Sequence, residues 1–164
     1  MSALASSSAH AARPDFAAQP HPSLYSEVND AEPGDHAFVA LRAAYRASGG
    51  IVRGDDLART FWDHQRGDYV SLARLIVARE IFSFRWNESY WIPMFQFERG
   101  EPAVKPGLSQ VLAELVDVFD GWRLAAWFAQ PSAWLNGQRP VDLLDSDLSG
   151  VRAAARVDRF IATG

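Results

Sequence analysis

The chain has 164 residues, no cysteine, 48% apolar residues and a formal net charge of −4. A chain of this size and composition forms one sizeable core or two small ones, and it has no disulfide or thiolate chemistry. It lacks both an apolar run of the roughly 18 residues that a membrane span needs and the basic and apolar regions of a signal peptide. We therefore expect a cytoplasmic protein that makes no contact with a membrane.

The charge is not concentrated in one strongly basic segment. Residues 1–37 carry one base and five acids, residues 38–99 nine bases and seven acids, and residues 100–164 six bases and eight acids. The corresponding net charges are −4, +2 and −2. Proteins that bind nucleic acid tightly use several phosphate contacts, so none of these segments is a strong candidate on charge alone.

Residues 1–35 predict a flexible tail. They are rich in Ala, Ser and Pro, and their apolar residues follow neither helical nor strand periodicity. Such a segment buries too little apolar surface to offset the entropy lost on ordering.

Residues 36–99 predict a helix-turn-helix or winged-helix-like domain. A first helix runs from His36 to the Gly49-Gly50 pair, and a second begins at Gly54 or Asp55. Residues 66–68 are typical of a turn, and a third helix is expected over residues 69–81. Three short helices with a tight turn before the last resemble the helix-turn-helix core.

A β-hairpin is predicted after the third helix. Phe82, Phe84 and Trp86 alternate with polar residues, the stretch 87–89 is a polar turn, and residues 90–97 are aromatic and β-prone. Pro93 is expected near a sheet edge, because proline cannot donate to a ladder. The hairpin is either a wing or a device that covers an aromatic cluster, and the aromatic residues favour core packing over stacking on bases.

Residues 104–164 predict a small helical domain beyond a Pro- and Gly-rich linker. Helices are expected over residues 108–119, over residues 122–129 and from Pro140 onward. Asp147 or Ser149 is expected to cap a last helix over residues 150–161. The fold class is thus mainly α, with a helix-turn-helix-like N-terminal domain that carries a hairpin and a small helical C-terminal domain.

Catalytic chemistry is not expected. Three of the four histidines lie in or beside the tail, and His64 alone makes no site. Asp55 and Asp56 stand where helix caps belong, and no spacing fits a metal or a phosphate loop. We expect neither an enzyme nor a metal site nor a cofactor.

DNA contacts are a weaker alternative. The third predicted helix is mostly apolar and leaves only a narrow polar strip, so a packed core helix is favoured over a DNA-reading helix. The candidate DNA-contacting residues are Ser71, Arg74, Arg79 and Arg85.

The segment Trp122–Pro140, WRLAAWFAQPSAWLNGQRP, resembles antitoxins of the Xre/MbcA/ParS type. The shared order is a Trp-Leu-Ala helix, a Pro break, a Trp-Leu-x-Gly turn and an Arg-Pro helix start, followed by a Leu-Leu helix, an acidic turn and a last helix. The stretch Trp86–Phe97 is similar to the junction that precedes the toxin-binding half of that family. The resemblance covers about residues 104–164.

The resemblance implies a cytoplasmic, homodimeric antitoxin that blocks a RES-type toxin, a class resembling NAD-consuming ADP-ribosyltransferases. The C-terminal segment would lie over the active site of the toxin, where an arginine would exclude the cofactor. Operator DNA is a further possible partner. The alternatives are a DNA-binding regulator and a solitary, divergent member with another partner. The candidate partner-binding residues are Trp134, Leu135, Gly137, Arg139, Pro140, Arg152, Arg156, Asp158, Arg159, Phe160 and Gly164. For Trp134 and Leu135, packing between helices is an equally weighted alternative.

Overall fold

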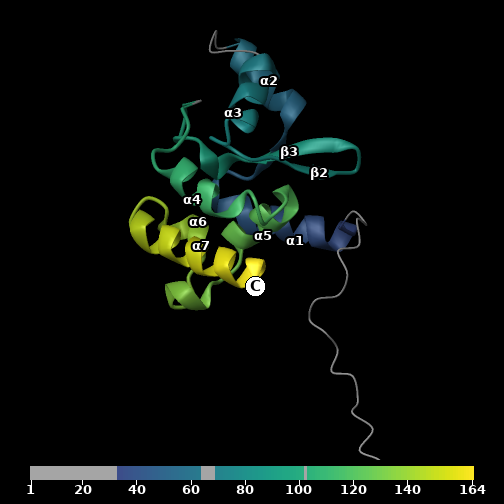
Figure 1. Ribbon diagram of the computed structural model, residues 1–164. Coiled ribbons are helices and arrows are strands. Elements are labelled where there is room, and N and C mark those ends of the chain that lie inside the picture. Colours follow the sequence, from purple (N-terminus) through teal and green to yellow (C-terminus); the bar gives the residue numbers. More distant parts are fainter. Residues whose placement is uncertain (1–32, 64–68, 102) are drawn as a thin grey trace, which may run out of the picture. The chain divides into compact units, whose positions relative to one another are not determined.

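The computed structural model describes residues 33–63, 69–101 and 103–164. The chain divides into the units Met1–Ala31 and Glu32–Gly164, and every described residue belongs to the second. This unit is mainly helical and contains a three-stranded antiparallel sheet (Figure 1), which confirms the mainly α fold class. The predicted tail lies outside the described residues except for residues 33–35, of which Asp35 begins the first helix.

The first helix, α1 (Asp35–Tyr45), follows the expected apolar pattern. Phe38, Leu41 and Tyr45 are its buried residues, and their spacing places them on one face. A short 3-10 turn, η1 (Arg46–Ser48), continues the helix until Gly49, whose φ of 104° ends it. The Gly-Gly stop expected from the sequence is confirmed, because a left-handed backbone at this point favours glycine.

Helices α2 (Gly54–Asp63) and α3 (Tyr69–Val77) correspond to the second and third predicted helices. Helix α3 ends at Val77 rather than at Ile81, since Arg79 adopts a φ of 59° and the Glu80 amide donates to the Leu75 carbonyl at 3.0 Å. This hydrogen bond and the left-handed residue together close a helix in the Schellman manner. The predicted turn at 66–68 and His64 lie outside the described residues, so the helix-turn-helix arrangement stays a prediction.

The sheet has the strand order β1-β3-β2, with β1 (Ile51–Arg53), β2 (Phe84–Trp86) and β3 (Ser89–Pro93) all antiparallel. The predicted hairpin is confirmed as β2 and β3. Asn87 and Glu88 form its turn with φ values of 48° and 59°, two positive values in succession as in the type I′ turn of a two-residue hairpin loop.

Pro93 belongs to the central strand and pairs with Ile51 of β1, but it lies beyond residues 89–91, the part of β3 that pairs with β2, so on that side it is at an edge as expected. It is tolerated there as the last residue of β3. The next amide, that of Met94, donates to the Gly50 carbonyl at 2.9 Å, so the pair Ile51–Pro93 is a position of the ladder that needs no donor from proline.

Residues 94–107 link the sheet to the C-terminal helices. A 3-10 turn, η2 (Met94–Gln96), is followed by a fold-back in which Phe97 bridges Val104. The fully buried Gln96 side chain accepts from the Phe82 amide at 2.8 Å and donates to the Phe82 and Pro93 carbonyls at 2.9 and 3.1 Å. It thereby satisfies backbone groups that the end of α3 and the strands leave unpaired.

The C-terminal half comprises α4 (Leu108–Leu115), α5 (Gly121–Ala129), the 3-10 turn η3 (Ala133–Leu135), α6 (Pro140–Leu143) and α7 (Leu148–Thr163). Their starts agree with the sequence signals. Pro140 occupies the first turn of α6, and Asp147, rather than Ser149, caps α7 by accepting from the Gly150 amide at 3.0 Å. Asp120 caps α5 in the same way.

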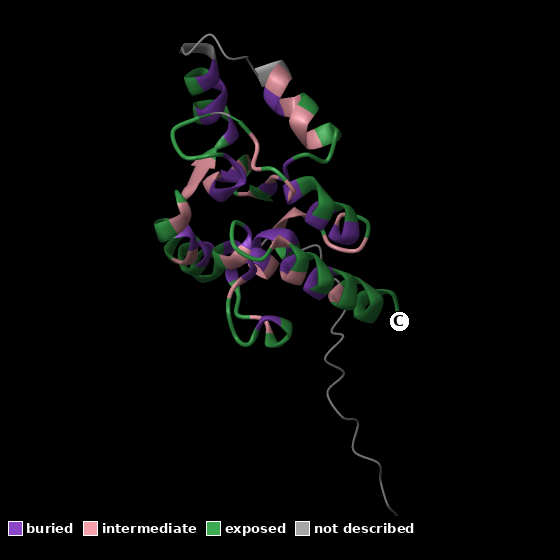
Figure 2. Ribbon diagram, turned by 90° about the vertical axis from the view of Figure 1, so that its left-hand side faces the viewer, coloured by how far each residue is buried: buried purple, intermediate pink, exposed green. Residues whose placement is uncertain are grey.

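The sheet separates two apolar clusters. In β3, Trp91 packs against the larger cluster and Ile92 belongs to the smaller one. In β1, Ile51 packs against the larger cluster and Val52 against the smaller one. The larger cluster takes residues from α1 and β2 and from α4 to α7, whereas the smaller one is built mainly from α2 and α3. Figure 2 marks the buried residues of the chain in purple. Residues on both sides of the 100–107 segment therefore share the larger core.

Candidate functional site

The last two turns of α7 extend beyond the core. Val151, Ala154 and Ala155 are the buried residues of this helix. After Ala155 the apolar side chains are exposed, with Phe160 at 75% and Ile161 at 49%. An exposed Phe on an ordered helix that covers nothing of its own fold is a typical feature of an interaction surface.

One side of α7 carries three arginines that share a single carboxylate. Glu114 of α4 is only 7% exposed. Its carboxylate lies 2.8 Å from Arg159, 3.2 Å from Arg156 and 3.5 Å from Arg152. Three arginines against one carboxylate leave a net charge of +2 on this side of the helix, and each guanidinium remains about half exposed.

The arginines also set the ionisation of Glu114. Burial opposes the charged form, but the hydrogen bond from Arg156 and the charges of Arg159 and Arg156 outweigh it. The pKa of Glu114 therefore lies below its ordinary value of 4.5, and the carboxylate is charged at neutral pH.

Asp158 organises the opposite side of α7. Its two oxygens accept hydrogen bonds from the indole of Trp127 at 2.7 Å and from the indole of Trp134 at 2.9 Å. The carboxylate thus joins α7 to α5 and to η3. Trp134 is 54% exposed although its indole N–H is held, so a large apolar surface is presented in a fixed position.

A small cavity of about 230 Å³ lies beside these side chains. It is lined by residues of α5, η3 and the intervening loop together with Asp158. The hydroxyl of Ser132, in this lining, is buried and has no hydrogen-bond partner among the described residues. The cavity has room for a water molecule or for part of a partner side chain that would satisfy this hydroxyl.

The remaining residues predicted to bind a partner divide by location. Leu135 and Pro140 are buried, and Arg139 is held by Asp142 at 2.7 and 2.9 Å and by the Ala44 carbonyl at 2.7 Å. These side chains are engaged within the fold. Gly137, with a φ of 77°, and Gly164 are exposed. Of the Trp134-Leu135 pair, Leu135 is packed within the fold and Trp134 is exposed, so partner binding by Trp134 stays a prediction.

The four candidate DNA-contacting residues lie on three separate elements: Ser71 and Arg74 on α3, Arg79 in the turn after it and Arg85 on β2. Arg79 forms an ion pair with Asp117 at 2.9 Å. Beside Arg74 the outer face of α3 presents Val77, which is 82% exposed. An apolar side chain in this position is of little use against phosphates or base edges.

Glu114, Trp127 and Gln110 contact the candidate residues of α7 but were not predicted from the sequence. Gln110 accepts from Arg152 at 3.4 Å. A signal existed, because Arg152, Arg156 and Arg159 are spaced i, i+4, i+7 and therefore share one face of a helix. A lone acid between apolar residues of a neighbouring helix, which Glu114 is, is the natural partner of such a face.

Two further findings concern the described part of the chain. Within residues 33–63, 69–101 and 103–164, no three His, Asp or Glu side chains gather so as to hold a metal ion. None of the helices described has the length and apolarity that crossing a membrane would require. In comparisons with known proteins, no family model, no curated protein and no solved structure matches this chain.

Proposed function

We propose that this protein is an antitoxin that binds a RES-type toxin through the C-terminal end of α7. The proposal rests on the resemblance of residues 104–164 to Xre/MbcA/ParS-type antitoxins. The observation that supports it most is the ordered end of α7, which leaves the core at Ala155 and presents Phe160 and Ile161 to solvent.

Phe160 and Trp134 are the aromatic anchors of this proposed surface. Aromatic and arginine side chains contribute most of the binding energy in many protein interfaces, especially when they are positioned before binding. Trp134 meets this condition through its hydrogen bond to Asp158. The net positive charge around Glu114 lies on the same helix and suits an acidic rim on the partner.

The role of the arginines differs from the one that the resemblance implies. Arg156 and Arg159 are engaged with Glu114 rather than free to enter a neighbouring active site. In this proposal the exposed apolar side chains at the end of α7 cover the entrance to the active site of the toxin. The arginines on the side of α7 attract the toxin electrostatically and orient it. Access of the cofactor is then blocked sterically.

Co-expression in cells tests the proposal. The chain is expressed together with a RES-type toxin, and cell growth is measured for the full chain and for a chain lacking residues 157–164. The deletion removes no buried side chain of the core, and Arg152 and Arg156 still neutralise Glu114, so the shortened protein should fold. We expect protection by the full chain only. Equal protection by a folded, shortened chain would refute the role of this segment.

A further inference from the structure

A groove of about 820 Å³ lies at the boundary between the two apolar clusters, away from the end of α7. Leu57, Phe61 and Phe97 line it from the smaller cluster, whereas Phe95 and Val141 line it from the larger one. Clefts between separately packed parts of a protein are frequent sites for small ligands, and this volume is within the range that such ligands occupy.

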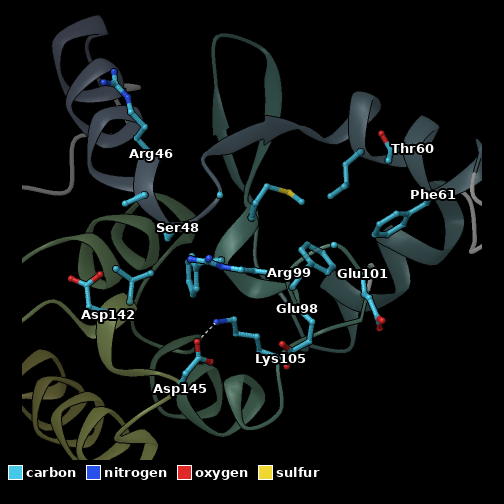
Figure 3. A pocket seen from close by; sticks show the side chains of 18 residues that line it. Arg46, Ser48, Thr60, Phe61, Glu98, Arg99, Glu101, Lys105, Asp142 and Asp145 are labelled. Atoms are coloured by element: carbon cyan, nitrogen blue, oxygen red, sulfur yellow. Dashed lines mark hydrogen bonds and ion pairs between the residues drawn. The ribbon is translucent and has the colours of Figure 1, made fainter.

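Three of the seven charged side chains that line the groove are already engaged in ion pairs. Lys105 lies 2.6 Å from Asp145, and Asp142 holds Arg139 in two hydrogen bonds. Figure 3 shows that Arg46 points away from the groove. These four residues are therefore not available to a ligand as free charges, which leaves Arg99, Glu98 and Glu101.

Arg99 is different. Its side chain extends across the groove, as Figure 3 shows, and in the described part of the chain it forms no hydrogen bond or ion pair. The carboxylates of Glu98 and Glu101 lie at the lower rim in the same view. Arg99 is exposed, so its guanidinium can donate several hydrogen bonds to a ligand without breaking an ion pair of the fold.

We propose that this groove binds an amphipathic monoanion, with its acyl or aromatic body on the apolar walls and its carboxylate or phosphate on Arg99. A guanidinium binds such groups in a planar, bidentate manner, and these charge-assisted hydrogen bonds are about twice as strong as neutral ones. The site shares no residue with the surface proposed for the toxin, so it does not depend on that function.

Decanoate and decyl phosphate are suitable probes, since they carry the two possible head groups on one chain. Decanol and decyltrimethylammonium are the neutral and cationic controls. Binding is measured on the full chain by calorimetry, together with the rise in melting temperature that a ligand of the native state causes. We expect saturable binding of at least one anion, and the tighter anion identifies the head group.

Two substitutions test whether the anion contacts Arg99. Arg99→Gln should weaken binding of the preferred anion about tenfold, since it removes a charge-assisted contact, whereas Arg46→Gln should leave it unchanged. Amide shifts in NMR spectra should appear at Gly49 and Gly100, which line the groove, and not in α7. The melting temperature without ligand confirms that both variants fold.

Three results would overturn the proposal. One is the absence of saturable binding by both anions at millimolar concentration. Another is an equal effect of the two arginine substitutions. The third is binding of decyltrimethylammonium as tightly as the anions, which would assign the groove to the rim carboxylates instead.

Discussion

The indole of Trp134 donates a hydrogen bond to Asp158 at 2.9 Å, and this contact fixes a half-exposed tryptophan beside the free end of α7. The other oxygen of the same carboxylate holds Trp127. A side chain that is ordered before binding loses less entropy when a partner covers it. The contact therefore connects the packing of three elements to the surface proposed for the toxin.

Replacing Asp158 with Ala should weaken toxin binding more than it weakens the fold. Both indoles lose their acceptor, so Trp134 is no longer held in place. We expect an affinity loss of about tenfold, with a loss of unfolding free energy of about 1 kcal/mol or less. Calorimetric titration and urea denaturation measure the two effects. Asp145→Ala is the matched control, because it also removes a carboxylate that forms a hydrogen bond, but Asp145 lies just before the start of α7, at the other end of the helix from Asp158.

Glu114→Gln should lower the stability of the fold. The substitution keeps the size of the side chain but leaves three arginines beside a neutral, mostly buried amide. Breaking a fully buried ion pair costs about 3–5 kcal/mol, but these guanidiniums are about half exposed. We therefore expect the unfolding free energy to fall by about 1–2 kcal/mol at pH 7. Asp117→Asn, in an exposed ion pair with Arg79, should change the unfolding free energy by less than about 0.5 kcal/mol.

The stabilisation by Glu114 should also depend on pH. Its pKa in the folded protein is below the ordinary value of 4.5, so the unfolded chain binds the proton more tightly. The contribution is complete above pH 4.5 and is lost as the pH falls through the lower, folded value. The difference between the wild-type protein and Glu114→Gln should thus shrink on acidification. A difference that stays constant or grows would contradict the assigned charge state.

Tyr45→Phe should act in the opposite pH range. The buried phenol donates to the Ala125 carbonyl at 2.5 Å, and burial raises its pKa far above the ordinary value of 10.0, with the charge of Arg139 opposing this shift. Stability contributed by a raised pKa is present below pH 10 and is lost as the pH rises above it. We expect the variant to lose about 1 kcal/mol at pH 7 and to show a smaller further loss above pH 10 than the wild-type protein. Unfolding curves at pH 7 and pH 11 measure this.

Gly121→Ala should separate α5 from the sheet. A Cβ atom at this position would lie 2.0 Å from the Ser83 carbonyl oxygen and 3.0 Å from the Phe84 Cα, so backbone would have to move. Overpacking of this kind costs about 1–3 kcal/mol. Gly34→Ala is the control, since nothing lies within 4 Å of a Cβ there. If thermal unfolding shows equal melting temperatures for the two variants, the close approach of α5 to β2 is wrong.

The helices were predictable because their signals are local. The apolar spacing of α1 and α4, the Gly49 stop, the first-turn Pro140 and the Asp147 cap each act within one or two turns of the chain. The hairpin was predictable for the same reason, since its alternation and its turn are contiguous.

The features that could not be predicted depend on contacts between segments that are distant in the sequence. Strand β1 has three residues and both faces of the sheet are covered, so neither length nor alternation marks it. The early end of α3 follows from the left-handed Arg79, which no local preference requires. The roles of Glu114 and Asp158 arise only when α7 packs against α4, α5 and η3.

The affinity of Phe160→Glu for a purified RES-type toxin that the full chain binds tests the proposed surface most directly. Val39→Glu is the control, because Val39 is also an exposed apolar residue on a helix but lies on α1. We predict that Phe160→Glu weakens binding about 30-fold or more, as expected for an interface anchor, and that Val39→Glu leaves it unchanged. Unchanged affinity of Phe160→Glu, or an equal loss in both variants, would contradict the assignment of the end of α7 as the binding surface.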